Sequence, residues 1–250
     1  MIVFVTGIDT DVGKTWITGK LLGTLRHTVN AGSMKLVQTG QERGPGPEGV
    51  SQDLREHRRL AGMNLLSEDL EGLTCPWIFR EPASPHWAAQ KEGHLLKEET
   101  LANAASLLEE RFPLVLCEGA GGILVPLAPG LSTLDFVARR GWPVLVVTTP
   151  RLGSINHTLL TIEAVKARGL ALAVIVNRCD AWGESLRASL LSTLAELQSQ
   201  GRVIEIPESA PGEAGPRDSD TNEGFSALAQ VVLNLCSRPG GLDSRRKGLL

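Results

Sequence analysis

The 250-residue chain has few of the features that are typical of secreted, membrane-spanning or disulfide-bonded proteins. Its four cysteines (Cys75, Cys117, Cys179 and Cys236) are far apart and form no CxxC pair, which argues against a zinc site and favours reduced thiols. No apolar run approaches the ~20 residues of a membrane span. The N-terminus also has no basic segment followed by an apolar core, as a secretion signal would have. We therefore expect a soluble, cytoplasmic protein with no membrane partner.

The sequence also lacks a basic excess. A formal net charge of −3 and an isoelectric point near 6.0 argue against a nucleic-acid partner. There is no internal repeat and no Ser/His/Asp nucleophile signature. His27, His57 and His94 lie in polar stretches and are expected at the surface, while His86 and His157 have no partners at metal-ligand spacing. We therefore assign no metal to histidine.

Short apolar runs alternate with helix-like stretches along the chain, which predicts a single α/β domain over residues 1–236. Strands are expected at residues 2–5, 34–37, 114–117, 143–149, 170–176 and 203–206. Helices are expected at residues 14–26, 53–61, 98–110, 182–200 and 221–236, and one ending near residue 168. About six parallel strands with helices on both faces make a doubly wound sheet of the P-loop NTPase type.

The remaining segments are expected to be irregular or solvent-exposed. Residues 40–49 are rich in glycine and proline and predict a mobile surface loop. Pro82 and Pro85 argue against regular structure in residues 74–87. The charges of the helix at residues 53–61 are interpreted as a solvated face. Residues 237–250 have no apolar period and are expected to be a loosely held tail.

The first fifteen residues carry the strongest motif. The predicted strand at residues 2–5 is followed by a loop containing Gly7 and Gly13, and then by Lys14, Thr15 and a helix. This is the phosphate-binding arrangement of P-loop proteins, in which backbone N–H groups, the helix N-terminus and the lysine hold phosphate and the hydroxyl holds magnesium. The spacing departs from GxxxxGK[ST], because five residues and not four separate the glycines.

Two acids in this loop are unusual. Asp9 and Asp11 stand in a segment that attracts phosphate, where a negative charge is unfavourable unless a cation lies nearby. They suggest a positively charged co-substrate beside the nucleotide.

Polar residues follow the other predicted strands, at residues 35–39, 118–122, 151–156 and 177–180. The carboxyl ends of parallel strands share one sheet edge, where ligands bind. There Thr15, Asp53 and Glu118 supply oxygen ligands suited to Mg²⁺. Lys14 and Lys35 supply two cations for a transferring phosphoryl group and an anionic acceptor. The residues thus predict a magnesium-dependent nucleotide enzyme with a second, partly cationic substrate.

These motifs resemble those of the dethiobiotin synthetases, the ATP-dependent enzymes of biotin synthesis. The resemblance rests on GIDTDVGKT at 7–15, KLVQTG at 35–40, EPASPH at 81–86, EGAGG at 118–122 and LGSINH at 152–157. The blocks occur in the family's order over about residues 1–180, with weaker similarity onward to Pro207. The resemblance implies ATP- and Mg²⁺-dependent carboxylation and ring closure of 7,8-diaminopelargonic acid with CO2, which yields dethiobiotin, ADP and phosphate.

The implied reaction passes through a carbamate and a carbamic-phosphoric mixed anhydride. One amine takes up CO2, ATP phosphorylates the carbamate, and the second amine closes the ureido ring. Because both amines belong to one bound molecule, ring closure is intramolecular and gains a large entropic advantage. The amines would be the cationic partner that the loop acids suggest.

The resemblance also implies a role for each matching residue. Lys14 and Lys35 are implied to be catalytic, and Thr15, Asp53 and Glu118 to hold magnesium. The implied nucleotide-binding residues are Asp11, Val12, Gly13, Lys14, Thr15, Asp53, Glu118, Asn177, Pro207 and Glu208, with Asn177 reading the adenine. The implied substrate-binding residues are Thr10, Asp11, Lys35, Thr39, Gly121, Ser154 and Asn156.

A homodimer with shared active sites is implied as well, because in the family the substrate carboxylate binds at a helix N-terminus of a second subunit. Here that helix would begin at residues 153–156, and its free N–H groups suit a carboxylate. Some positions depart from the family pattern: Leu36 replaces a usual proline, Gln38 a small residue, Arg151 a lysine and Asp11 a frequent glutamate. None removes a charge that the reaction needs.

Three rival interpretations remain. A partition or division-site ATPase would carry a signature lysine early in the loop, where this chain has Asp9. The ATPase half of a cobalamin-type amide synthase would need an attached glutaminase domain, for which 250 residues leave no room. A pure nucleotide-binding module would leave Lys35 and Glu118 unexplained.

Overall fold

The computed structural model describes residues 1–41, 49–208 and 216–237. Most of the predicted loop at 40–49 and of the predicted tail lies outside these residues. The strands are β1 (Ile2–Gly7), β2 (Ala31–Lys35), β3 (Leu114–Gly122), β4 (Pro126–Ala128), β5 (Leu131–Ser132), β6 (Val144–Thr148), β7 (Leu172–Asn177) and β8 (Val203–Ile206). The helices are α1 (Lys14–Leu25), α2 (Gln52–Leu60), α3 (Ser67–Leu70), α4 (Pro85–Lys91), α5 (Glu98–Arg111), α6 (Thr133–Arg139), α7 (Ser154–Ala167), α8 (Glu184–Thr193), α9 (Ala195–Ser199) and α10 (Pro216–Cys236).

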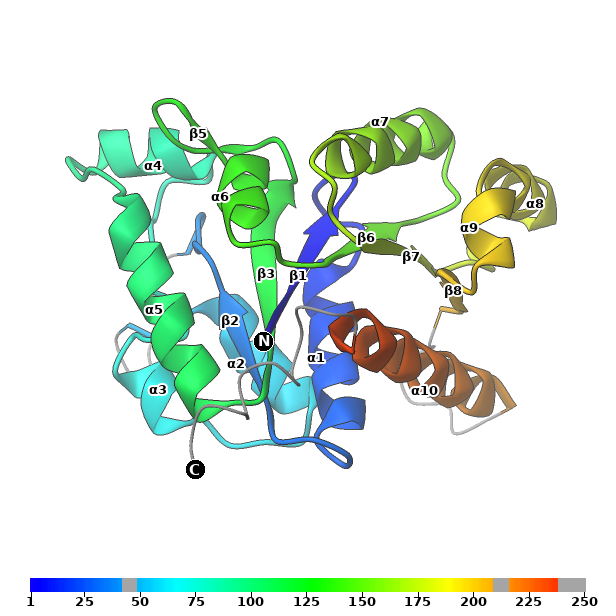
Figure 1. Ribbon diagram of the computed structural model, residues 1–250, viewed down its shortest axis with the longest axis horizontal. Coiled ribbons are helices and arrows are strands. Elements are labelled where there is room, and N and C mark those ends of the chain that lie inside the picture. Colours follow the sequence, from blue (N-terminus) through cyan, green and yellow to red (C-terminus); the bar gives the residue numbers. More distant parts are fainter. Residues whose placement is uncertain (42–48, 209–215, 238–250) are drawn as a thin grey trace.

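Six strands form one parallel sheet in the order β2-β3-β1-β6-β7-β8. The central strands β1, β6 and β7 are buried throughout, as expected for apolar strands covered on both faces. Helices α1, α2 and α10 cover one face, while α5 to α9 cover the other (Figure 1). The predicted α/β fold of the P-loop type is therefore confirmed.

The register of the sheet brings two predicted site residues together. Lys35, the last residue of β2, is the direct neighbour of Glu118 in β3, and Glu118 is also paired with Val5 of β1. Strand β3 continues through Gly122, so Glu118 lies within the strand and not at its end as predicted. Side chains alternate between the two faces of a strand, so Glu118 faces α1 and α2 whereas Cys117 faces the opposite layer.

Several elements differ from the sequence prediction. Strand β2 begins at Ala31 and ends at Lys35, because pairing with β3 includes small residues of low strand propensity. Pro85 begins α4, since proline is favoured in the first helical turn, where its missing N–H costs nothing. The predicted helix at 182–200 is divided into α8 and α9 at Leu194. The β4-β5 hairpin and α6 were not predicted.

Over the described residues, no helix is both long and apolar enough to cross a membrane.

Candidate functional site

The loop between β1 and α1 has the backbone of a phosphate-binding turn. Gly13, directly before α1, adopts a left-handed conformation with φ of 91°, which a side chain would strain. A Cβ added to Gly13 would lie 2.2 Å from Asn177 Nδ2, so the close approach also requires glycine. Asn177, the last residue of β7, donates from Nδ2 to the carbonyl oxygen of Val12 at 2.9 Å. A side chain from β7, two strands away from β1 in the sheet, thus holds the loop in place.

The two charged residues of the loop that were least expected have different surroundings. Asp9 Oδ2 accepts a hydrogen bond from Arg151 Nη2 at 2.7 Å, so a cation of this chain already balances its charge. Asp11 is exposed, lines the pocket described below and adopts a left-handed conformation with φ of 55°. Of the two acids that suggested a cationic substrate, Asp11 is therefore the one whose surroundings still favour it.

Lys14 is buried at the start of α1, and its ammonium donates to the carbonyl oxygen of Asp9 at 2.8 Å. Burial lowers the pKa of Lys14, although Glu118 acts in the opposite direction. The Lys14 ammonium thus contacts the backbone of the loop in which it would bind phosphate.

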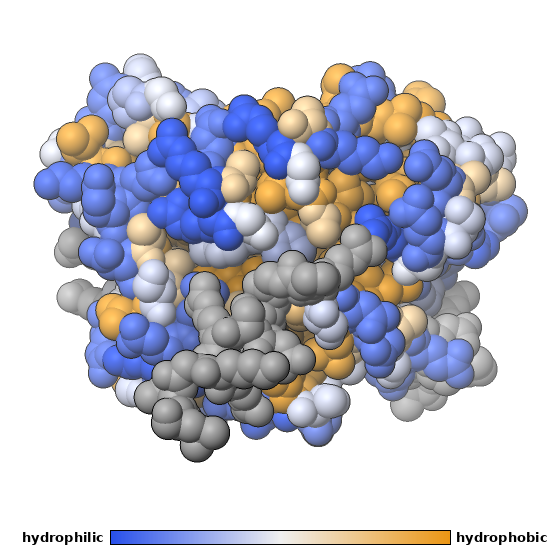
Figure 2. Space-filling view, in the orientation of Figure 1, coloured by the Kyte–Doolittle hydropathy of each residue, from blue (hydrophilic) through white to orange (hydrophobic). Residues whose placement is uncertain are grey.

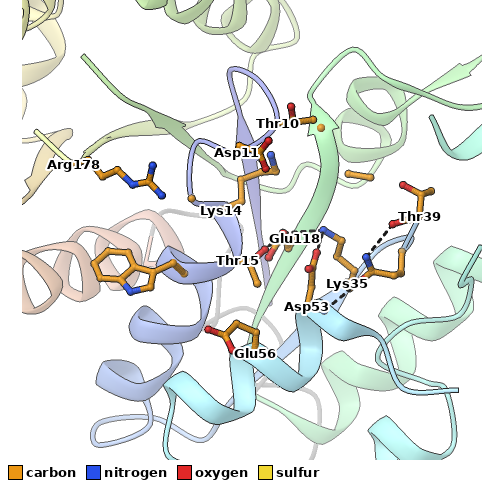
Figure 3. A pocket seen from close by; sticks show the side chains of 15 residues that line it. Thr10, Asp11, Lys14, Thr15, Lys35, Thr39, Asp53, Glu56, Glu118 and Arg178 are labelled. Carbon is orange, nitrogen blue, oxygen red and sulfur yellow. Dashed lines mark hydrogen bonds and ion pairs between the residues drawn. The ribbon is translucent and has the colours of Figure 1, made fainter. Parts of the chain in front are cut away.

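Lys35 lies between two carboxylates at the centre of the site (Figure 3). Its Nζ is 2.8 Å from Glu118 Oε1 and forms a second ion pair with Asp53 Oδ2. Burial alone would lower the pKa of Lys35, but Glu118 and Asp53 outweigh it and raise the pKa above its ordinary value. Lys35 is therefore a buried cation that stays protonated at neutral pH.

Glu118 is fully buried and has hydrogen-bond donors on both carboxylate oxygens. Oε1 accepts from Lys35 Nζ at 2.8 Å and from Thr15 Oγ1 at 3.0 Å. Oε2 lies 2.7 Å from His57 Nε2. Burial would raise the pKa of the Glu118 carboxyl, but Lys35 and His57 hold it well below its usual range. The carboxylate is therefore ionised at neutral pH.

The environment of His57 corrects the sequence prediction. His57 was expected at the surface, yet it has no exposed surface and contacts Glu118. Arg58 is also buried and forms a bidentate pair with Asp69, at 2.8 Å to each oxygen. The interpretation of the charges in α2 as a solvated face is therefore wrong for these two residues.

A periodic signal for this face was present in the sequence. Leu54, His57, Arg58 and Ala61 are spaced i, i+3, i+4, i+7, as on the buried side of an amphipathic helix, and all four are buried. The same geometry explains how α2 serves the site: Asp53 and His57 are four residues apart and reach Lys35 and Glu118, respectively.

Gln38 anchors the start of α2, which explains a position where the chain departs from the family pattern. Its Oε1 accepts from Ser51 Oγ at 2.6 Å and from the backbone N–H of Asp53 at 3.3 Å. Ser51 is the N-cap of α2 and accepts from the N–H of Leu54. The larger side chain thus positions the helix that carries Asp53.

These residues line a pocket of about 500 Å³ at the carboxyl edge of the sheet. It brings together many of the predicted site residues: Thr10, Asp11, Gly13, Lys14, Thr15, Lys35, Thr39, Asp53, Glu118 and Gly121. Its lining also includes Trp16, Gln38, Glu56, Ala120 and Arg178, to which the sequence prediction gave no role. Arg178 and Thr39 lie at opposite ends of the lining (Figure 3).

The other predicted residues lie outside this lining, as far as the structure describes it. Asn177 and Val12 contact each other. Ser154 and Asn156 belong to the first turn of α7, with Ser154 buried and Asn156 exposed. Pro207 and Glu208 follow β8, and the N–H of Glu208 donates to Asp180 Oδ1 at 2.7 Å.

The donor set of the pocket fits a magnesium ion shared with a nucleotide. Mg²⁺ in such sites takes one or two carboxylates and completes its shell with phosphate oxygens and water. Asp53 and Glu118 provide two carboxylates, and Thr15 Oγ1 lies 3.0 Å from Glu118 Oε1. Among the described residues no group of three or more His, Cys, Asp or Glu side chains forms a metal cage.

Comparison with known proteins gives the same family as the motifs. A family model described as an AAA domain matches residues 2–207. The chain is 42% identical over 241 residues to the ATP-dependent dethiobiotin synthetase BioD of Chlorobaculum tepidum, which covers 96% of this chain and 95% of that protein. It is 40% identical over 178 residues to BioD 2 of Haemophilus influenzae, which covers 70% of this chain and 90% of that protein.

Solved structures of more distant proteins share the fold alone. A plasmid partition protein of Borrelia burgdorferi has a TM-score of 0.57 at 12% identity, with 93% of this chain and 97% of that chain covered. The cell division protein MinD of Aquifex aeolicus has a TM-score of 0.54 at 14% identity, with 93% and 97% covered. The rival partition-ATPase interpretation therefore shares this fold, and sequence identity separates the two. The chain belongs to the ATP-dependent dethiobiotin synthetases, a family of P-loop ligases of biotin biosynthesis.

Proposed function

We propose that this pocket carries out the carboxylation and ring closure of 7,8-diaminopelargonic acid with CO2 and ATP, yielding dethiobiotin, ADP and phosphate. The observation that carries the proposal is the position of Lys35, a buried cation that contacts two carboxylates and lines the same pocket as the phosphate loop. A nucleotide-binding module would have no use for a second lysine there, whereas a carbamate and a transferring phosphoryl group both need a cation.

The steps follow from the residues that line the pocket. An amine nitrogen attacks the carbon of CO2 and loses a proton, which gives a carbamate. A carbamate oxygen then attacks the γ-phosphorus, and ADP leaves. Lys14 and Lys35 would balance the negative charge of the carbamate and of the phosphoryl group during this transfer. The second amine attacks the carbamoyl carbon and loses a proton, and the bond from that carbon to the phosphate oxygen breaks, so that phosphate leaves with the electron pair.

Other acidic and polar residues of the pocket lining suit the diamine. Asp11 carries an exposed carboxylate, and Thr10, Thr39 and Gly121 line the same pocket. We assign them to the amines and the carbamate. Holding both nitrogens beside the anhydride would make ring closure intramolecular.

We further propose that Thr15, Asp53 and Glu118 hold Mg²⁺. When bound, the ion would neutralise charge on the β- and γ-phosphates. Asn177, Pro207 and Glu208 are assigned to the adenine end of the nucleotide.

A homodimer with shared active sites is also proposed. The loop before α7 and the helix itself expose leucines, with Leu152 84%, Leu159 38% and Leu160 56% exposed. Apolar side chains are visible at the surface over this helix (Figure 2). A second copy that covered them would bring the first turn of α7, with Ser154 and Asn156, to the substrate carboxylate of its neighbour. The four cysteines are free thiols, which supports a cytoplasmic location.

The decisive test is release of phosphate from ATP and Mg²⁺ in bicarbonate, with and without the diamine. We expect release to depend on the diamine and to match the dethiobiotin formed mole for mole. Hydrolysis that proceeds equally without the diamine, or that DNA or lipid stimulates, would overturn the proposal and favour a switch ATPase. Sedimentation of the protein at several concentrations tests the dimer: a monomer at all of them would contradict it.

A further inference from the structure

His57 is a buried side chain beside the proposed site that the proposed reaction does not use. It has no exposed surface, and both ring nitrogens have partners. Nε2 lies 2.7 Å from Glu118 Oε2, and Nδ1 lies 3.1 Å from Ser33 Oγ. Of the charged groups around it, Glu118 on β3 contacts the ring directly, Arg58 on the same helix contacts Ser33, and Lys35 on β2 contacts the other oxygen of Glu118. Glu56, one residue before His57 on α2, interacts with it electrostatically. The ring thus bridges β3, through Glu118, and β2, through Ser33.

The direction of these hydrogen bonds follows from what each group can donate. An ionised carboxylate only accepts, so His57 Nε2 must carry the proton that it shares with Glu118. On the other side, Arg58 Nη1 can only donate, and it lies 2.8 Å from Ser33 Oγ. The Ser33 hydroxyl hydrogen then remains free to point at His57 Nδ1. One consistent chain of donors runs from Arg58 through Ser33 and His57 to Glu118.

This chain is anchored well away from the pocket. Arg58 forms a bidentate pair with Asp69, whose Oδ1 also accepts from Thr74 Oγ1 at 2.7 Å. All five groups behind Glu118 (Ser33, His57, Arg58, Asp69 and Thr74) are buried. Buried, fully hydrogen-bonded networks restrict side-chain rotation, because every alternative rotamer leaves a polar group unpaired.

The two oxygens of Glu118 consequently have separate tasks. His57 fixes Oε2, which prevents rotation of the carboxylate about its last torsion. Oε1 then points to Thr15 Oγ1 and Lys35 Nζ, on the side of the phosphate loop. Outer partners that orient a ligating carboxylate affect metal affinity or activity 10- to 100-fold where they have been removed.

We propose that His57 is a positioning residue, which turns the Glu118 carboxylate so that Oε1 faces the divalent cation bound with the nucleotide. This inference rests on the proposed role of Glu118 as a magnesium ligand. Because a buried ring could also serve packing alone, the test must separate orientation of Glu118 from stability of the fold.

Two polar substitutions separate the contacts of the ring. In His57→Gln the side-chain NH2 can take the place of Nε2 and still donate to Glu118. In His57→Asn the shorter side chain can take the place of Nδ1 and contact Ser33, but it does not reach Glu118. His27→Leu is the matched control, because His27 is exposed.

Calorimetric titration of ADP, once with Mg²⁺ and once with EDTA, provides a readout that does not depend on turnover. For the wild type we expect ADP to bind more tightly with Mg²⁺ than with EDTA. We define the Mg²⁺ gain as the ratio of ADP affinity in Mg²⁺ to ADP affinity in EDTA. His57→Asn should reduce this gain at least about ten-fold, while its ADP affinity in EDTA stays within about two-fold of the wild type. His57→Gln should restore most of the gain, and His27→Leu should match the wild type.

Three results would overturn the inference. The first is an unchanged Mg²⁺ gain in His57→Asn. The second is an equal loss in EDTA and Mg²⁺, which would assign His57 to the fold alone. The third is an equal loss of the gain in the Asn and Gln variants. A wild type with no Mg²⁺ gain at all would instead refute the proposed magnesium site itself, so the two failures are distinguishable.

Discussion

Replacing Lys35 with methionine tests the centre of the site, because it removes the charge but keeps most of the side-chain volume. The Lys35 side chain is 6% exposed and the Glu118 side chain 1%, so the pair is shielded from solvent. Asp53, the second partner, is 23% exposed and contributes less, since water screens it. The substitution leaves Glu118 with only the Thr15 and His57 donors for its buried charge.

Loss of one partner of a buried ion pair costs about 3–5 kcal/mol, and the remaining donors put Lys35→Met at the lower end, about 3 kcal/mol. For a chain of this size each kcal/mol lowers the melting temperature by about 2–4 °C, so we expect a decrease of about 6–12 °C. Calorimetry without ligands measures it. We also expect kcat to fall at least about 100-fold, as when one charge-stabilising group is removed from an active site, while ADP binding stays close to normal.

The exposed Lys20 on α1 provides the control, since Lys20→Met removes the same charge without a buried partner. A Lys35→Met protein with wild-type melting temperature and turnover would refute both parts of the reasoning. Lower stability with normal turnover would limit Lys35 to a structural role and remove it from the mechanism.

Three further predictions follow from particular contacts. Gly13→Ala should abolish measurable nucleotide binding by calorimetry, because its Cβ would lie 2.2 Å from Asn177 Nδ2 and φ is 91°; binding within about two-fold of the wild type would contradict the loop geometry. Burial would raise the pKa of Asp69, but Arg58 and other donors hold it below its ordinary value, so its stabilising effect is present above about pH 4 and lost below it. The melting temperature should therefore decrease as the pH falls from about 5 to about 3, and less steeply in Asp69→Asn; equal slopes would exclude Asp69 as a contributor. Burial raises the pKa of Cys75 to about 12 and of Cys179 and Cys236 to about 11. With Cys117 also buried, the native protein should show no fast reaction with a disulfide reagent at pH 8, and four thiols should react after unfolding; a fast-reacting native thiol would contradict this burial.

The parallel core and the phosphate loop could be predicted from sequence because their signals are local. The run at 2–5 and the GKT tripeptide define strand, loop and helix start within fifteen residues. The predicted strand at 114–117 was placed correctly, because an uninterrupted apolar run predicts a strand buried on both faces. Its extension through Gly122 was missed, since glycines have low strand propensity and pair there only because β1 lies alongside.

The hydrogen-bond partners of Glu118 could not be predicted from local signals of this kind. His57 and Arg58 lie in a segment whose composition is strongly charged, and composition alone favours exposure. Only the i, i+3, i+4 spacing with Leu54 indicated the buried side. Even that spacing could not identify Glu118 and Ser33 as partners, because those contacts join residues 61 and 24 positions apart.

The pairing of Asp9 with Arg151 illustrates a further limit. The acid in the loop was interpreted as a sign of a cationic substrate, whereas a residue 142 positions away supplies the cation. The sequence places both residues at the same sheet edge, but it does not show which of several charges there will pair. Such choices depend on side-chain reach and on the register of the strands.

The position of β1 between β3 and β6 also has a consequence for folding during synthesis on the ribosome. Ile2 pairs with Val115, and Phe4 pairs with Val144, so the N-terminal strand leaves the ribosome more than a hundred residues before either neighbour. At about 5–20 residues per second, the phosphate loop would wait roughly 6–25 s before β6, the later of these two neighbours, begins to emerge. Nascent chains that end before residue 144 should therefore be unable to bind nucleotide. The first motif to be synthesised is among the last to become functional.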